Sequence, residues 1–110
     1  MGSNKGEPPD KPEVLDSIDR VIHEPARLKV LALLYVVKSA DFLFIMTQTG
    51  LTFGNLCSHM NKLQEAGYIS VVKDFVGKKP HTMLSLTEKG RTAFKEYRKT
   101  MQQFFDELPG

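Results

Sequence analysis

The sequence predicts a small α+β domain that is mainly α, and three observations predict it. Apolar residues recur at helical spacing over most of the chain after residue 13. Two short runs between residues 68 and 86 instead carry the β-branched and aromatic residues typical of strands. The 110 residues leave room for one domain with a thin core, and 41% hydrophobic with 25% charged residues is ordinary for a folded protein.

The chain begins with a segment that has no apolar anchor. Residues 1–12 contain several Gly and Pro residues, so we predict a disordered tail followed by a single domain over residues 13–110. Apolar residues then fall at helical spacing as far as Ile22, which predicts a short amphipathic helix. The sequence His23-Glu24-Pro25 should end it, because a proline cannot continue a helix interior.

A second helix should form the centre of the domain. Pro25 suits its first turn, and the helical pattern runs on to about Lys38. Apolar residues surround this helix on most sides, as expected for a helix that other elements cover. The stretch Ser39-Ala40-Asp41 is predicted to be a break between helices.

Two further helices, over residues 41–66, are predicted from their caps. Asp41 can cap a third helix, Phe42 to Thr49, which Gly50 stops. Thr52 can cap a fourth helix, which runs to Ala66 and is stopped by Gly67.

A hairpin and a long helix complete the chain. Strands over residues 68–75 and 81–86 flank the basic tip Val76-Gly77-Lys78-Lys79-Pro80, so residues 68–86 should form a β-hairpin. Thr87 can cap the last helix, residues 88–106, whose apolar spacing persists to Phe105.

This order of elements is that of a winged helix-turn-helix, a three-helix core with a β-hairpin wing. Residues 51–69 (LTFGNLCSHMNKLQEAGYI) resemble the recognition helix and first wing strand of MarR/ArsR-type regulators. Residues 77–82 (GKKPHT) and 86–91 (LTEKGR) are similar to the wing and the start of the final helix in that group. The resemblance covers about Ile18 to Phe105 and is nearest to its small winged helix DNA-binding domain members.

The resemblance implies a cytoplasmic transcriptional regulator that binds double-stranded DNA as a homodimer. The charge distribution agrees with a polyanionic partner. Residues 62–99 hold nine Lys or Arg against four Asp or Glu, whereas residues 1–24 hold three against six. A single cysteine also fits a reducing compartment.

The fourth helix and the hairpin would contact the DNA. One face of the helix carries short side chains that can form hydrogen bonds, which suits the base edges in a major groove. The alternative is an ordinary solvated polar face, which any helix of a small domain has. The hairpin tip offers lysines to flanking phosphates, where relatives usually carry an arginine that can enter a minor groove. The predicted DNA-binding residues are Thr52, Asn55, Ser58, His59, Lys62, Lys73, Lys78, Lys79 and His81.

The first and last helices carry apolar stripes that would be costly to leave in water. Packing them against a symmetry mate would bury them and enlarge the thin core, although an antiparallel pair within one chain is the alternative. The predicted dimer-interface residues are Val14, Leu15, Ile18, Ile22, Phe94, Tyr97, Met101, Phe104 and Phe105.

The third helix departs from the pattern of relatives, which usually alternate apolar and charged residues there. Leu43 and Phe44 cannot share the core face with Phe42, so they touch either another part of the dimer or an apolar partner or ligand. This leaves open an alternative function, a non-catalytic module that uses this helix for protein contact. A sensor that responds to an unidentified small-molecule effector is a third interpretation.

Neither a metal, a cofactor nor catalysis is predicted. Cys57 lies on the apolar side of the fourth helix and has no second thiol, and the three histidines are scattered. The sequence has no glycine-rich phosphate loop, nucleophile elbow or plausible triad, so we expect no enzyme. No apolar run approaches the roughly 20 residues of a membrane span, so we expect no membrane partner.

Overall fold

Side-chain caps define where four of the helices begin in the computed structural model, which describes residues 11–110. The helices are α1 (Lys11–Asp16), α2 (Pro25–Val37), α3 (Phe42–Thr49), α4 (Phe53–Glu65) and α5 (Glu88–Asp106), and the strands are β1 (Ser39–Asp41), β2 (Ile69–Val76) and β3 (Lys79–Leu86). The Asp41 carboxylate accepts the Phe44 N–H at 2.7 Å, and the Thr52 hydroxyl accepts the Asn55 N–H at 3.2 Å. The predicted caps of α3 and α4 are therefore confirmed.

The first helix is shorter than the sequence predicted. α1 ends at Asp16, not at Ile22, and it begins at Lys11, within the predicted tail; the rest of that tail, residues 1–10, lies outside the described residues. Asp19 explains the early end, because its carboxylate accepts the N–H groups of Val21 and Ile22 and so replaces the carbonyls that a helix would supply. Ile18 and Ile22 are still buried, but they reach the core from a loop.

A third strand was missed, and the hairpin is longer than predicted. β1 pairs antiparallel with β3, which gives a sheet of order β1-β3-β2. The register pairs Val76 with Lys79, so Gly77 and Lys78 form a two-residue turn in place of the predicted five-residue tip. Pro80 lies inside β3, but the short β1 pairs only with residues 83–85, so the proline has no strand on its other side to disturb.

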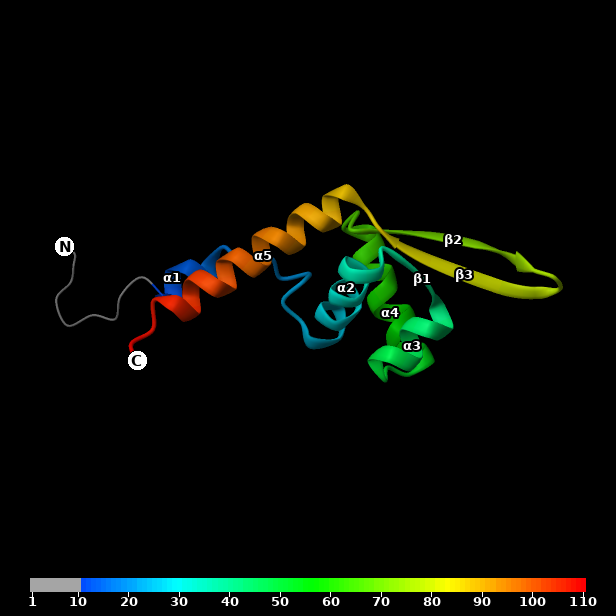
Figure 1. Cartoon of the computed structure of the whole chain (residues 1–110), viewed down its shortest axis with the longest axis horizontal. Helices are drawn as coiled ribbons and strands as arrows, with labels where there is room; N and C mark the ends of the chain where they lie inside the picture. The colour runs from blue at the N-terminus through cyan, green and yellow to red at the C-terminus, as the bar shows by residue number, and fades with distance from the viewer. Residues whose placement is uncertain (1–10) are drawn as a thin grey trace.

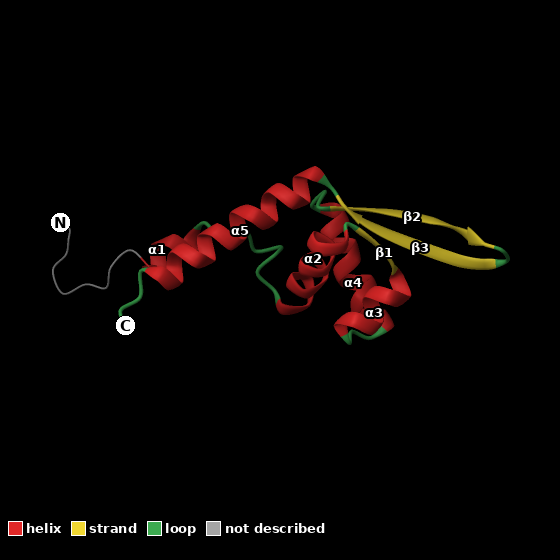
Figure 2. Cartoon of the chain, in the orientation of Figure 1, coloured by secondary structure: helices red, strands yellow, loops and turns green. Residues whose placement is uncertain are grey.

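The core surrounds α2, as its apolar pattern predicted. Val30, Leu31 and Leu34 of this helix are fully buried, together with residues from the loop before it, from α3 and α4, and from the sheet. Figures 1 and 2 show α2, α3 and α4 gathered in the middle of the molecule, with the β2–β3 hairpin extending to one side and α5 to the other. This is the winged helix arrangement that the order of elements predicted.

The molecule is elongated because the β2–β3 hairpin and α5 extend away from the core in opposite directions. It measures 66 × 25 × 21 Å with a radius of gyration of 17.5 Å, against the roughly 13 Å expected for a compact chain of about 100 residues. At the far end from the hairpin, α1 lies alongside the C-terminal half of α5 (Figure 1). The two helices form a layer that projects beyond the three-helix core.

A set of close contacts fixes α5 to the base of the hairpin. The Thr87 hydroxyl donates to the Gly67 carbonyl at 2.7 Å and accepts the Gly90 N–H at 2.9 Å, while the Thr87 N–H donates to the Tyr68 carbonyl at 3.1 Å. Gly90 is buried so closely that a Cβ at this position would lie 2.1 Å from the Tyr68 carbonyl oxygen. Only glycine allows α5 to begin here.

Replacing Gly90 with alanine should therefore destabilise the protein by about 1–3 kcal/mol, because the backbone must move to admit the methyl group. Gly54→Ala is the matched control. Gly54 lies in α4, and the described residues leave no atom within 4 Å of the place where its methyl group would stand, so alanine there should stabilise the helix by about 0.5–1 kcal/mol. Urea unfolding of the three proteins measures both values, and equal stability of the two variants would contradict the close contact.

Candidate nucleic-acid interface

The outward face of α4 is polar and carries small side chains. Leu56, Met60 and Leu63 bury one side of the helix in the core. The opposite side exposes Gly54, Asn55, Ser58, Asn61, Lys62 and Glu65. Asn55, Ser58 and Lys62 are therefore exposed where the sequence predicted, and Gly54 and Asn61 belong to the same surface. Sequence reasoning missed these two, although a helical wheel centred on the three buried residues places both of them opposite the core.

His59 lies apart from this surface, in contact with α2. The Arg27 guanidinium donates to His59 Nδ1 at 3.2 Å, and a Glu24 carboxylate oxygen lies 3.8 Å from the same nitrogen. Burial would raise the pKa of Glu24, but the Arg27 N–H bond and the nearby His59 and Arg27 charges outweigh it and lower the pKa. The start of α2 therefore holds the His59 ring beside Arg27 and Glu24, and its DNA contact stays a prediction.

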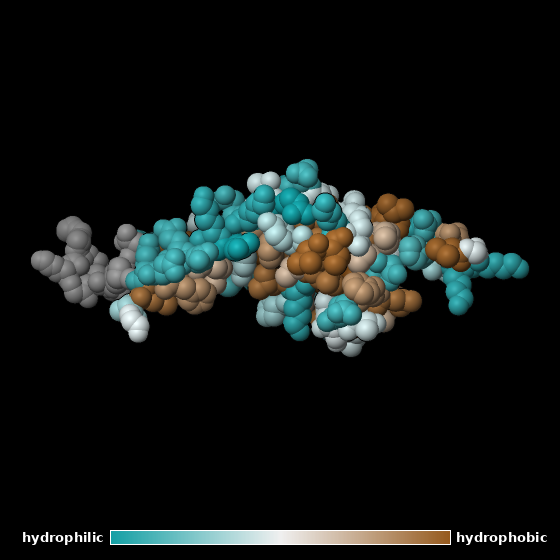
Figure 3. Space-filling view, in the orientation of Figure 1, coloured by the Kyte–Doolittle hydropathy of each residue, from teal (hydrophilic) through white to brown (hydrophobic). Residues whose placement is uncertain are grey.

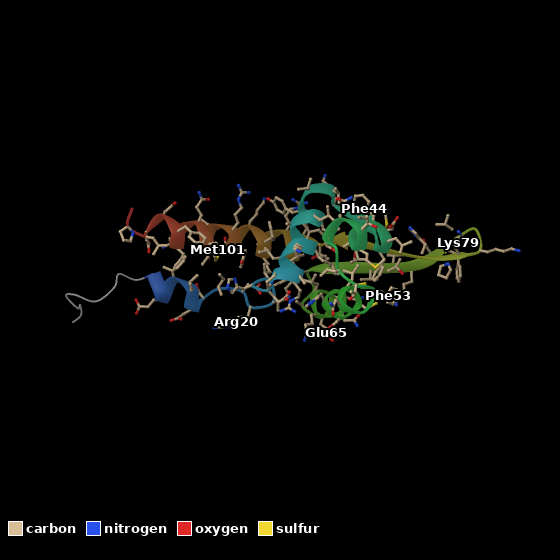
Figure 4. All side chains as sticks on the ribbon, turned by 90° about the horizontal axis from the view of Figure 1, so that it is seen from below. Arg20, Phe44, Phe53, Glu65, Lys79 and Met101 are labelled. Atoms are coloured by element: carbon tan, nitrogen blue, oxygen red, sulfur yellow. The ribbon has the colours of Figure 1, made fainter. Side chains whose placement is uncertain are left out.

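Gly77 shapes the tip of the hairpin. Its φ of +65° meets the requirement of the tight turn, and the turn places Lys78 and Lys79 at the extreme end of the molecule. Both lysines are exposed, as is Lys73 further down β2. Figure 4 shows Lys79 projecting from this end, away from all other elements.

The His81 ring lies between two acidic side chains. Its Nδ1 lies 3.1 Å from an Asp74 carboxylate oxygen, and its Nε2 lies 3.9 Å from Asp41. Two carboxylates beside the ring disfavour a phosphate there. His81 thus supports the sheet near the start of α3, and its predicted phosphate contact is not favoured by this arrangement.

The lysines of α4 and the hairpin have no acidic partner within 4 Å among the described residues. Among residues 11–110, each ion pair within 4 Å involves a histidine, so Lys62, Lys73, Lys78 and Lys79 keep their charge uncompensated by a carboxylate at that distance. Free lysines on an extended hairpin and on the adjacent helix are suited to a phosphate backbone.

A hollow of about 350 Å³ lies between the start of α3, α4 and the hairpin. Phe53 and Cys57 line it from α4, and Lys73, Pro80 and His81 line it from the hairpin. Cys57, on the apolar side of α4, is half-buried. Phe53 is 65% exposed and stands on the side of α4 nearest the hairpin (Figure 4).

The predicted dimer residues divide into two groups. Ile22 is fully buried, and Ile18 and Tyr97 are 8% exposed, so these three belong to the core of the single chain and leave almost no surface for a partner. Burial also raises the pKa of Tyr97, whose hydroxyl lies 2.9 Å from His23 Nδ1. The others are half-buried or exposed in the layer of α1 and α5 and along α5: Val14, Leu15, Phe94, Met101, Phe104 and Phe105.

Neither a metal site nor a membrane span is found in the described chain. In residues 11–110, no three His, Cys, Asp or Glu side chains gather as a metal ion would require. None of the helices described is both long and apolar enough to pass through a membrane.

Comparison with known proteins agrees with the class that this geometry defines, a winged helix DNA-binding protein. Residues 26–105 match the family model for the winged helix DNA-binding domain. The uncharacterized protein MJ0432 of Methanocaldococcus jannaschii is 36% identical over 78 residues, which are 71% of this chain and 85% of that protein. The chain therefore belongs to the winged helix DNA-binding domain family.

Solved structures place it among transcriptional regulators. A transcriptional regulator homologue from Pyrococcus horikoshii OT3 is 26% identical with a TM-score of 0.79, over 90% of this chain and 96% of that one. A MarR-family regulator from Silicibacter pomeroyi (16%, TM-score 0.61, 87% and 64% covered) and the ArsR-family regulator RHA00566 (17%, TM-score 0.55, 89% and 96% covered) share the fold. The resemblance to MarR/ArsR-type regulators is confirmed.

Proposed function

We propose that this protein is a homodimeric transcriptional regulator that binds a specific site on double-stranded DNA. α4 would enter a major groove with Asn55, Ser58 and Lys62, and the hairpin would place Lys78 and Lys79 on flanking phosphates. Thr52 would stand beside the backbone at the start of α4, where free N–H groups favour an anion. One combination of features carries the proposal: a helix face of short polar side chains stands beside an extended hairpin whose lysines have no carboxylate within 4 Å among the described residues. The chain that combines them belongs to the winged helix DNA-binding domain family.

The apolar surface of α1 and α5 supports a homodimer. Among the described residues, no further layer covers the apolar side of these two helices, and Phe105 is 58% exposed. Figure 3 shows apolar side chains along one edge of this end of the molecule. A second copy related by a two-fold axis would cover that edge and set two α4 helices about one helical turn of DNA apart.

The proposed function also bears on the location of the protein and on its need for a cofactor. The regulator would act in the cytoplasm, and binding to DNA needs neither a cofactor nor catalysis. A small-molecule effector would fit such a regulator.

One observation favours a second candidate function, a protein-interaction module. Leu43 and Phe44 on α3 are 65% and 43% exposed, so the rest of the described chain leaves much of both side chains uncovered. An apolar partner could dock there. A protein that bound no duplex even at low salt would favour this candidate over the first.

The hairpin lysines should contribute affinity without sequence preference. Lys78→Ala and Lys79→Ala should each weaken binding to all duplexes similarly and lower the slope of log affinity against log salt by about 1. Lys99→Ala, on the exposed face of α5, is the control and should keep the wild-type slope. Fluorescence anisotropy over a salt series measures the slopes, and a wild-type slope near zero would remove the DNA-binding proposal.

Asn55 should instead determine which site is preferred. Its amide can pair with adenine through two hydrogen bonds, which is worth about 1–3 kcal/mol of discrimination. Asn55→Ala should therefore change the sequence that the protein selects from a random duplex pool, whereas Gln102→Ala on α5 should not. An unaltered preference would show that the α4 face does not read bases.

Phe105→Glu should dissociate the dimer, because it places a charge in the apolar surface of α1 and α5. Light scattering should change from about twice the 12.4 kDa chain mass to the mass of one chain. Phe75→Glu is the matched control, since Phe75 is a similarly exposed aromatic residue on the hairpin. A wild-type protein that is monomeric at all concentrations, or a Phe75→Glu variant that also dissociates, would contradict this interface.

A further inference from the structure

Phe53 is an apolar residue at a position where the rest of the helix surface is polar. It is the first residue of α4, and 65% of it is exposed. Exposed apolar residues that stand together mark a binding surface, and Phe53 lines one hollow together with Phe42 and Leu43. Phe53 shares a side of the helical wheel with the buried residues of α4, but it stands at the exposed end of the helix, so the core does not cover it.

The ring of Phe53 is held in position rather than free to swing. Its centroid lies 5.2 Å from that of Phe42 at an interplanar angle of 57°. Phe42 is itself buried at the start of α3, so it is a fixed support. One side of the Phe53 ring is thus packed, and the remainder is presented beside the hollow between the start of α3, α4 and the hairpin.

The first turn of α4 offers few hydrogen-bonding side chains. The Thr52 hydroxyl already accepts the Asn55 N–H, and Gly54 has no side chain. Among the described residues no atom lies within 4 Å of the place where a Gly54 methyl would stand, so the backbone there is open to close approach. Beside Asn55, this turn therefore presents an aromatic ring and bare backbone.

Major-groove edges contain one apolar group, the C5 methyl of thymine. The N-terminal residues of a recognition helix are those that approach base edges. Phe53 is the first residue of α4 and is therefore one of the residues that would approach the bases first.

We infer that Phe53 reads a thymine through its C5 methyl group, at the N-terminal end of α4. This inference rests on the proposed DNA-binding function and names a specificity-determining residue within it. It requires that the preferred site contain a T·A pair at which the methyl group, and not only the hydrogen-bonding edge, contributes to affinity.

Replacing thymine with uracil removes only that methyl group and keeps every base-pairing and groove hydrogen-bonding atom. The full-length protein should first select its preferred duplex from a random pool. Its affinity for this duplex should then be compared with that for versions in which each thymine in turn is uracil. At one position in each half-site the wild-type affinity should fall about fourfold, the factor expected for one buried methyl-sized group.

The Phe53→Ala variant should bind the thymine and uracil duplexes equally at that position. Phe44→Ala is the matched control, since it truncates the same type of side chain at another exposed position and should keep the fourfold difference. Thermal unfolding of both variants establishes that they are folded. Because the comparison is between two duplexes for one protein, a general loss of affinity cancels.

Three results would overturn the inference. Equal affinity of the wild type for all thymine and uracil duplexes would do so, as would a Phe53→Ala variant that keeps the difference. A selected site without thymine in the contacted positions would do so as well. In each of these cases DNA binding itself stands, whereas a protein that binds no duplex at low salt overturns the proposed function together with this inference.

Discussion

The fold depends on the close approach of α5 to the base of the hairpin. Gly90 lies against the Tyr68 carbonyl, and Thr87 bonds to both Gly67 and Tyr68. These contacts join the end of α4, the start of β2, the end of β3 and the start of α5 at one place. The recognition surface and the helix proposed to form the dimer are thereby held in a fixed relation, which a two-fold regulator needs if both of its halves are to meet DNA in register.

Tyr68 extends this junction to the other end of the chain. Its hydroxyl donates to the Asp19 carboxylate, whose other oxygen organises the loop that follows α1. Burial, and the Asp19 carboxylate beside it, raise the pKa of Tyr68 to about 12, so the phenol remains a donor throughout the neutral range. The loop that delivers Ile18 and Ile22 to the core is therefore tied to the same point as α4, the hairpin and α5.

Local signals in the sequence were sufficient for most of the fold. The caps Asp41, Thr52 and Thr87, and the stops Gly50 and Gly67, depend on contacts within a few residues, so they can be predicted without knowing the tertiary structure. The early end of α1 could not, because it depends on Asp19, which also bonds to a tyrosine 49 positions away. β1 was missed since three residues are too few to show an alternating pattern.

The candidate interface was predictable in outline and less so in its members. Periodicity separated the polar side of α4 from its buried side, but it could not show that Arg27 and Glu24 hold His59 or that two carboxylates surround His81. Those partners come from α2 and from the sheet, so only the folded arrangement identifies them. The same holds for Phe53, which shares a side of the helical wheel with core residues and yet stands exposed at the end of the helix.

Dimethyl sulfate protection tests the central claim most directly, because the reagent reports guanine N7 in the major groove and adenine N3 in the minor groove. With the full-length protein bound to its selected duplex, the account predicts protection of guanine N7 in two major grooves about one helical turn apart. Protection confined to adenine N3, or no protection on a duplex that the protein demonstrably binds, would contradict entry of α4 into the major groove.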